Sequence, residues 1–365
     1  MINIAKKKLV RYNIDNLLSK NSLINILYGE RSNGKSYQVK HKIIIPEYFN
    51  NGNRFMYVRR WKDEISQFTV EQYFADVDID KLTNGKYNTV QLWRKKIYLA
   101  KYDPETMTTK RGEFMGYAVV LSQEQNLAGG SFLDVTNIVF EEFMSRSMYI
   151  AKESEKLSNL FSTIDRKRGI VKLWLVGNTI TRSNPYLVEW DLLKDVHNLK
   201  QGEIFTKEIS VSESEKISIS IEHCFSTGDT SFVIGHNAGM INSGDWQSEP
   251  QPKLPKSKKE YIVKFRVLFI YKSLQFVGEL LQDKETMVKS WFIYPRKDDK
   301  IIKKIIVFSD IVKTDPYWQS DIYHMKCKNQ RILQYTDLFT EDNIFYSDDL
   351  TGTDFKNVIN FSIRK

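Results

Sequence analysis

The residues with the clearest chemistry form a glycine-rich loop near the start of the chain. Residues 29–36 have the pattern Gly-x-x-x-x-Gly-Lys-Ser and follow a short apolar run. The glycines let backbone N–H groups turn inward and bind phosphate oxygens, while the lysine supplies positive charge and the serine a hydroxyl for Mg²⁺. The pattern predicts a nucleoside triphosphate site made by Gly29, Glu30, Arg31, Ser32, Asn33, Gly34, Lys35 and Ser36.

Two adjacent carboxylates form the second candidate. Glu141 and Glu142 end an apolar run that begins at Ile138. In P-loop ATPases the first carboxylate of such a pair belongs to the Mg²⁺ shell, and the second polarises the attacking water. Asn178 ends another apolar run. Its amide could sense the γ-phosphate or orient water, and it could equally be a turn former.

These motifs need a scaffold that brings the ends of several strands together. Strand-like runs at residues 24–28, 54–60, 137–143 and 171–178 alternate with segments of helical spacing. In a parallel α/β sheet, the carboxyl ends of such strands meet at one edge and form the binding site. Two more strand candidates, 89–100 and 115–121, are expected to pair as an inserted hairpin. Residues 1–205 are therefore expected to form an α/β P-loop ATPase domain.

The composition changes beyond residue 205. Residues 206–258 contain a polar stretch and then a segment rich in Gly, Pro, Ser and Lys, which indicates a linker. Four β runs and a helical tail follow. Residues 259–365 are therefore expected to form a smaller α+β domain.

The whole chain has the composition of a globular protein with a basic surface. Its 365 residues are 41% hydrophobic and carry a net charge of +9, which favours a polyanionic partner such as nucleic acid. Two distant cysteines do not make a disulfide framework. His223-Cys224 and His324-x-x-Cys327 lack further zinc ligands and are expected to be structural. No apolar segment approaches membrane-spanning length, so no membrane partner is expected.

Four motifs, taken in order, resemble the DNA-packaging ATPases of small tailed bacteriophages of the phi29 type, distant relatives of terminase large subunits. They are Gly29 to Tyr37, Tyr57-Val58-Arg59-Arg60-Trp61-Lys62, Ile138-Val139-Phe140-Glu141-Glu142-Phe143, and Asn178 with Asn184-Pro185-Tyr186. The resemblance covers most of the N-terminal domain and, more faintly, the C-terminal one. It implies an additional-strand P-loop NTPase fold, RecA- and terminase-like, followed by a ribonuclease H-like domain.

By this resemblance, the enzyme hydrolyses ATP with Mg²⁺ and drives double-stranded viral DNA into a preformed procapsid. The implied partners are the portal protein, a phage packaging RNA and identical subunits in a ring, expected to be a pentamer. Such a protein acts in the host cytoplasm, is transiently attached to the procapsid and is absent from the mature virion.

The resemblance also implies roles for single residues of the nucleotide site. Lys35 and Glu142 are catalytic, while Ser36 and Glu141 hold the metal. Arg31 matches a basic position that engages the catalytic glutamate or the nucleotide. Asp is usual where this chain has Glu141, so the metal geometry is left open.

One further catalytic group is expected from a neighbouring subunit. Arg166 matches the position of a trans-acting arginine finger, whose guanidinium neutralises charge developing on the γ-phosphate. Arg168 competes with it for this role.

Basic residues on loops are the candidate DNA contacts, because a translocating protein must hold phosphates without reading bases. They are Lys62, Lys110 and Arg111, with Arg94, Lys95 and Lys96 on the expected hairpin.

Nuclease activity is not expected. Relatives with a nuclease bind two metals with a cluster of Asp and Glu, whereas the run at residues 267–271 carries no carboxylate. Isolated acids that remain are Asp310, Asp348, Asp349 and Asp354. Two alternatives stay open: a terminase large subunit with an active metal-dependent nuclease, and a nucleotide-gated, non-catalytic scaffold that binds portal and RNA.

Overall fold

The chain forms two compact units, which are described separately. The computed structural model describes residues 12–145, 149–180, 184–210, 216–225, 250–297, 305–309, 318–319 and 343–363. The first unit comprises Met1–Thr179 and Asn198–Asp245, and the second comprises Ile180–His197 and Trp246–Lys365. Asp310, His324 and Cys327 lie outside the described residues. Within the described ranges, no helix combines the length and apolar character needed to cross a membrane.

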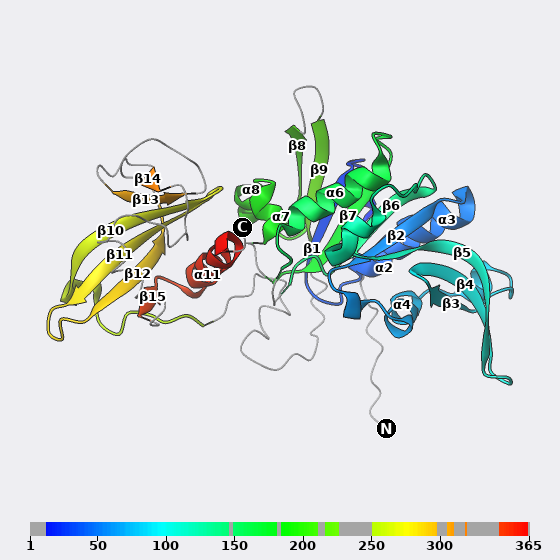
Figure 1. Ribbon diagram of the computed structural model, residues 1–365, viewed down its shortest axis with the longest axis horizontal. Helices are drawn as coiled ribbons and strands as arrows, with labels where there is room; N and C mark the ends of the chain where they lie inside the picture. Colours follow the sequence, from blue (N-terminus) through cyan, green and yellow to red (C-terminus); the bar gives the residue numbers. More distant parts are fainter. Residues whose placement is uncertain are drawn as a thin grey trace. The chain divides into compact units, whose positions relative to one another are not determined.

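A nine-stranded sheet is the centre of the first unit (Figure 1). Its order is β3-β4-β5-β2-β6-β7-β1-β9-β8, and neighbouring strands from β5 to β9 run parallel. The central strands are β1 (Ile24–Gly29), β2 (Arg54–Arg59), β6 (Val135–Glu141) and β7 (Lys172–Asn178). The others are β3 (Thr89–Trp93), β4 (Lys96–Asp103), β5 (Thr108–Val120), β8 (Ile204–Ser210) and β9 (Lys216–Cys224).

Helices bury the apolar side chains of the central strands. Leu27, Tyr57 and Trp174 share one core cluster with Val39 and Phe74 of the helices. On this side lie α2 (Lys35–Val39), the π-helical turn η1 (Lys40–Ile44), α3 (Ile45–Asn51) and α4 (Gln67–Phe74). A longer helix, α6 (Glu153–Asp165), contacts β6. Shorter segments are α1 (Asp15–Leu18), η2 (Lys62–Glu64), α5 (Ile79–Leu82) and η3 (Leu121–Leu127).

The expected hairpin differs in its details. Residues 89–100 are two antiparallel strands, because the chain reverses at Arg94 and Lys95, whose φ angles are 47° and 62°. The long strand β5 pairs with β4 through its first part and with β2 through residues 116–120. It is therefore a member of the main sheet rather than part of a separate insertion.

The prediction of a linker over residues 206–258 is wrong for the first part of this range, which forms two strands of the main sheet. Strand β9 pairs in parallel with β1, with Gly29 opposite Cys224, and β8 pairs with β9. The polar character of this stretch arises because β8, at the edge of the sheet, alternates exposed and half-buried residues. Residues 180–197, which were assigned to the first domain, belong to the second unit. They contain α7 (Pro185–Glu189) and most of α8 (Leu193–Asn198).

The second unit is built on a six-stranded sheet in the order β14-β13-β10-β11-β12-β15. Strands β10, β11 and β12 are successively antiparallel, whereas β13 runs parallel to β10 and β14 parallel to β13. This strand order agrees with the ribonuclease H-like domain that the family resemblance implies. Phe355 of the last helix packs its ring against Phe269 and Phe276. The elements are η4 (Lys258–Glu260), β10 (Tyr261–Tyr271), β11 (Leu274–Asp283), β12 (Lys289–Pro295), β13 (Ile306–Ser309), β14 (Trp318–Gln319), β15 (Ile344–Tyr346) and α11 (Asp349–Ile363).

Candidate functional site: a nucleotide cavity at the carboxyl edge of the first sheet

The glycine-rich loop connects β1 to α2, as the sequence predicts. At two positions of the loop the backbone conformation requires glycine. A Cβ on Gly29 would lie 2.9 Å from the carbonyl oxygen of Cys224, and Gly34, which precedes the helix, has a φ of 102°. These conformations curl the loop tightly above the sheet, so that its N–H groups can face an anion at the start of the helix.

Lys35 is buried in the loop itself. Its Nζ donates hydrogen bonds to the carbonyl of Glu30 at 2.5 Å and to Oδ1 of Asn33 at 3.1 Å. Burial lowers the pKa of this ammonium group. Both of these acceptors are neutral oxygens of the loop. A phosphate that replaced them would form a stronger, charge-assisted hydrogen bond with the ammonium group of Lys35.

Ser36 and Glu141 form a polar pair across the loop. The serine Oγ donates to Oε2 of Glu141 at 2.9 Å. The other carboxylate oxygen, Oε1, is buried and lacks a hydrogen-bond partner within the described part of the chain. Burial raises the pKa of Glu141 to about 7. A hydroxyl beside a buried carboxylate is a donor set suited to Mg²⁺ or a water of its shell, so these residues fit the metal.

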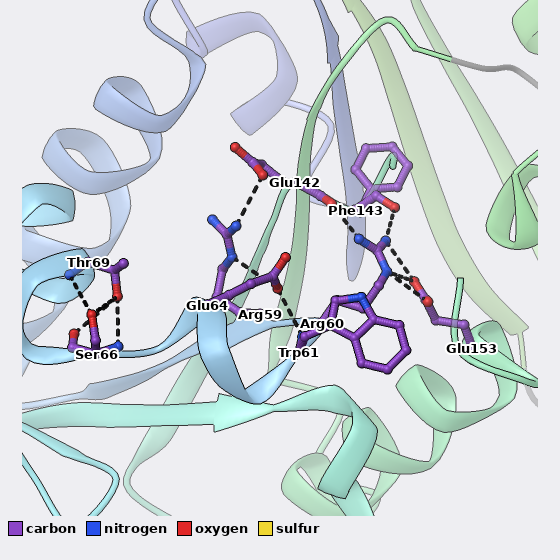
Figure 2. Close-up of polar contacts among 9 residues, drawn as sticks. All are labelled: Arg59, Arg60, Trp61, Glu64, Ser66, Thr69, Glu142, Phe143 and Glu153. Atoms are coloured by element: carbon purple, nitrogen blue, oxygen red, sulfur yellow. Dashed lines mark hydrogen bonds and ion pairs between the residues drawn. The ribbon is translucent and has the colours of Figure 1, made fainter. Parts of the chain in front are cut away.

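Glu142 is held differently from its neighbour. It has a φ of 56°, and its side chain is 61% exposed, whereas Glu141 is buried. Figure 2 shows its carboxylate beside Arg59 at the end of β2, with Nη2 donating to Oε2 at 3.1 Å. Arg59 also lies 3.6 Å from Glu64. The residue bonded to the candidate catalytic glutamate is therefore Arg59, while Arg31 lines the cavity.

Arg60 fixes the backbone that carries Glu142. Its guanidinium donates two hydrogen bonds to the buried Glu153 at 2.8–3.0 Å. The same group donates to the carbonyls of Glu142 at 3.2 Å and Phe143 at 2.6 Å (Figure 2). Both members of the ion pair are almost inaccessible to water, with side chains 3% and 0% exposed. A buried pair of this kind positions the segment rigidly.

Lys35, Ser36, Glu141 and Glu142 line one cavity of about 330 Å³. Its walls are residues 31–37 together with Asp76, Glu141, Glu142 and residues 176–178. Asn178 therefore ends β7 beside the loop, as the order of parallel strands predicts. The volume and the convergence of one lysine, one hydroxyl and two carboxylates suit the phosphates of a nucleotide.

The two candidate arginine fingers have different environments. Arg168 donates to five backbone carbonyls, those of Asp165, Leu133, Phe132, Val135 and Ile164. Arg166 is exposed and donates to the carbonyl of Gly130. Both precede β7, whereas the cavity is at its far end, about 20 Å away for a strand of this length. Neither can reach the nucleotide cavity of its own subunit.

The candidate DNA contacts fall into two places. Lys62 lies in η2, just beyond the end of β2 and near the cavity edge. Lys110 and Arg111 lie early in β5, whose last residue, Val120, is opposite Arg59. Ten strand residues separate Lys110 from that edge by about 30 Å. The structure therefore does not bring these three residues together.

Sequence reasoning did not assign roles to Arg59, Arg60 and Glu153. The two arginines belong to a motif that the resemblance used, but nothing in their spacing shows that one meets Glu142 and the other a glutamate distant in sequence. The position of β2 beside β6 was the missing information.

Comparisons with known proteins agree with this geometry. Residues 6–223 match the family model described as Podovirus DNA encapsidation protein (Gp16). The chain is 30% identical over 194 residues to the DNA packaging protein of Bacillus phage phi29 and 29% identical over 184 residues to that of Bacillus phage B103. These matches cover 51% and 50% of the chain and 52% of each relative, so the chain spans about half the length of the curated relatives it matches.

Solved structures of packaging motors share the fold of the whole chain. The bacteriophage Phi-29 viral genome packaging motor assembly aligns with a TM-score of 0.54 at 21% identity, over 96% of this chain and 99% of that one. The Phi-28 gp11 DNA packaging motor aligns with a TM-score of 0.51 at 16% identity, over 96% and 97%. At these identities the likeness establishes the fold, whereas the family model matches well over half of the sequence. The chain belongs to the Podovirus DNA encapsidation protein (Gp16) family.

Proposed function

We propose that this protein is an ATPase that drives double-stranded DNA into a viral procapsid. The observation that carries the proposal is the cavity in which Lys35, the Ser36–Glu141 pair and Glu142 converge. Membership of a DNA encapsidation family supports the identity of the translocated polymer.

In the proposed reaction, Lys35 leaves the loop carbonyls and contacts the outer phosphates. Ser36 and Glu141 hold Mg²⁺, which when bound neutralises charge on the phosphates. Glu142 accepts a hydrogen bond from the attacking water and takes its proton, and Asn178 orients that water. One oxygen of Glu142 accepts a hydrogen bond from Arg59, so this contact competes with the interaction between Glu142 and the water.

The site is proposed to be completed by a neighbouring subunit. Arg166 is exposed on the edge of the sheet opposite to the cavity, a position that suits contact with another copy. The guanidinium of Arg168 already donates hydrogen bonds to five backbone carbonyls of its own subunit. We therefore assign the trans-acting role to Arg166. A ring of subunits, with five as the proposed number, satisfies this requirement.

The remaining roles are divided between the two units. Lys62, near the cavity edge, is the proposed contact with duplex DNA, and the second unit is proposed to dock on the portal protein and a packaging RNA. Strand β10 carries no Asp or Glu, so we propose no nuclease activity there. The protein would act in the host cytoplasm while attached to the procapsid.

Phosphate release measured with and without duplex DNA tests the proposal. Wild-type protein should hydrolyse ATP faster with DNA, and Glu142→Gln should lose about 100-fold or more in turnover while still binding ATP. Glu155→Gln removes an exposed carboxylate paired with Lys152 and is the matched control, expected to behave as wild type. ATP binding without turnover in the wild type would favour a nucleotide-gated scaffold. Metal-dependent cleavage of plasmid DNA would favour a terminase with an active nuclease.

A further inference from the structure

The outward face of the β3–β4–β5 hairpin carries a continuous row of aromatic rings. Trp93, Tyr98, Phe114 and Tyr117 follow one another with ring centroids 6.4, 5.5 and 4.9 Å apart. The opposite face carries the apolar side chains Val90, Ile97, Leu99 and Met115, which belong to the core. Because strand side chains alternate, the aromatic row is on the opposite side of the strands, where Tyr117 at one end packs against the buried Phe132 and Trp93 is at the other end. Trp93 is 40% exposed.

Cations lie over these rings. The guanidinium of Arg111 is 3.9 Å from the ring centroid of Trp93, and that of Arg94 is 4.4 Å from the same ring. The ammonium of Lys96 is 4.9 Å from the ring centroid of Phe114. Stacking fixes each cation while its N–H groups remain available to an anion.

Within the described residues, none of Arg94, Lys96 and Arg111 forms an ion pair with a carboxylate. Two other lysines of the same region do form such pairs. Lys86 contacts Glu113 at 2.5 Å, and Lys101 contacts Asp80 at 3.5 Å. A fourth cation on the row, Arg54, lies 4.4 Å from the ring centroid of Phe114 and is paired with Asp134, so the uncompensated charges of the row are those of Arg94, Lys96 and Arg111.

A face with both aromatic rings and uncompensated cations can bind a polymer whose bases stack on the rings and whose phosphates pair with the cations. A duplex presents phosphates but keeps its bases stacked inside, so it would leave the aromatic row unused. We propose that this face binds single-stranded nucleic acid, with phosphates on Arg94, Lys96 and Arg111 and with an unpaired base that takes the place of one of the two guanidinium groups on the ring of Trp93. The residues of this face lie on β3, β4 and β5 and the turns between them, whereas Lys62, the proposed duplex contact, follows β2. This inference goes beyond the proposed ATPase function.

Fluorescence anisotropy of labelled oligonucleotides, with the full chain and without ATP, tests the proposal. Short single-stranded DNA and RNA of one mixed sequence should both bind more tightly than the corresponding DNA duplex. Trp93→Ala should weaken single-strand binding by about 5- to 100-fold, and Trp93→Phe should retain most of it. Arg111→Gln should lower the slope of log affinity against log salt by about 0.7.

Lys101→Gln is the matched control on the same hairpin. Its ammonium already pairs with Asp80, so neither affinity nor salt slope should change. The melting temperature should be the same in all these variants, which verifies that they fold. The proposal is overturned if duplex binds as tightly as single strands, if Trp93→Ala leaves the affinity unchanged, or if the variants alter self-association of the protein instead. Because ATP is absent, failure here is distinct from failure of the proposed hydrolysis.

Discussion

Replacing Arg59 by glutamine should speed hydrolysis in the absence of DNA. The side chain of Arg59 is only 17% exposed, but that of its partner Glu142 is 61% exposed, so water competes for the contact. An ion pair of this kind is worth about 0.2–1 kcal/mol. This free energy corresponds to a decrease of about 1.4- to 5-fold in the population of Glu142 that is not bound to Arg59. The basal turnover number of Arg59→Gln should rise by that factor, and KM for ATP should not change.

Steady-state phosphate release at saturating Mg²⁺ and ATP is the assay. Arg59→Lys, which retains a cation beside Glu142, should stay near the wild-type rate. A fall in turnover of tenfold or more would refute the reasoning, because it would show that Arg59 stabilises the transition state rather than withholding Glu142. An unchanged rate would show that the contact has no energetic consequence.

The other predictions concern neighbouring contacts. Arg60→Met removes the ion pair with the buried carboxylate of Glu153, which also accepts a hydrogen bond from the N–H of Ile150, and should lower the free energy of unfolding in urea by about 3–5 kcal/mol. The double variant Arg60→Met/Glu153→Leu should recover most of this loss, and no recovery would exclude the buried charge as the cause. The pKa of Glu141 is raised to about 7 by burial, so the free protein is partly protonated there near neutral pH, and Mg²⁺ requires the ionised form. Affinity for Mg²⁺ and ATP should therefore rise as pH increases through about 7, with proton release seen by calorimetry in buffers of different ionisation enthalpy, and Glu141→Gln should abolish this dependence. Arg166→Ala should lower turnover by about 10³-fold, and mixing it with Glu142→Gln subunits should restore part of the activity only if the arginine acts in trans, whereas Arg168→Ala should chiefly lower the melting temperature.

Local motifs allowed much of the fold and the cavity to be predicted. The loop at Gly29, the paired acids at Glu141 and the amide at Asn178 each follow an apolar strand, and parallel strands necessarily bring their carboxyl ends together. The ribonuclease H-like strand order came from the resemblance, and the pairing of β10 with both β11 and β13 agrees with it.

Contacts between distant segments could not be predicted in the same way. The bond between Arg59 and Glu142 and the pair between Arg60 and Glu153 depend on which strands are neighbours, which spacing along the chain does not specify. Strand β9 was assigned to a linker although Ile217, Ile219 and Ile221 alternate with polar residues, a period typical of a strand. The polar sequence around it outweighed that signal.

The central claim is that ATP hydrolysis at this cavity moves duplex DNA. The most direct measurement is the amount of duplex DNA that becomes protected from nuclease inside procapsids, recorded together with the ATP consumed. Wild-type protein should protect DNA in proportion to the ATP hydrolysed, and Glu142→Gln should bind ATP and protect none. Hydrolysis without protection of DNA, or equal protection by Glu142→Gln, would contradict the account.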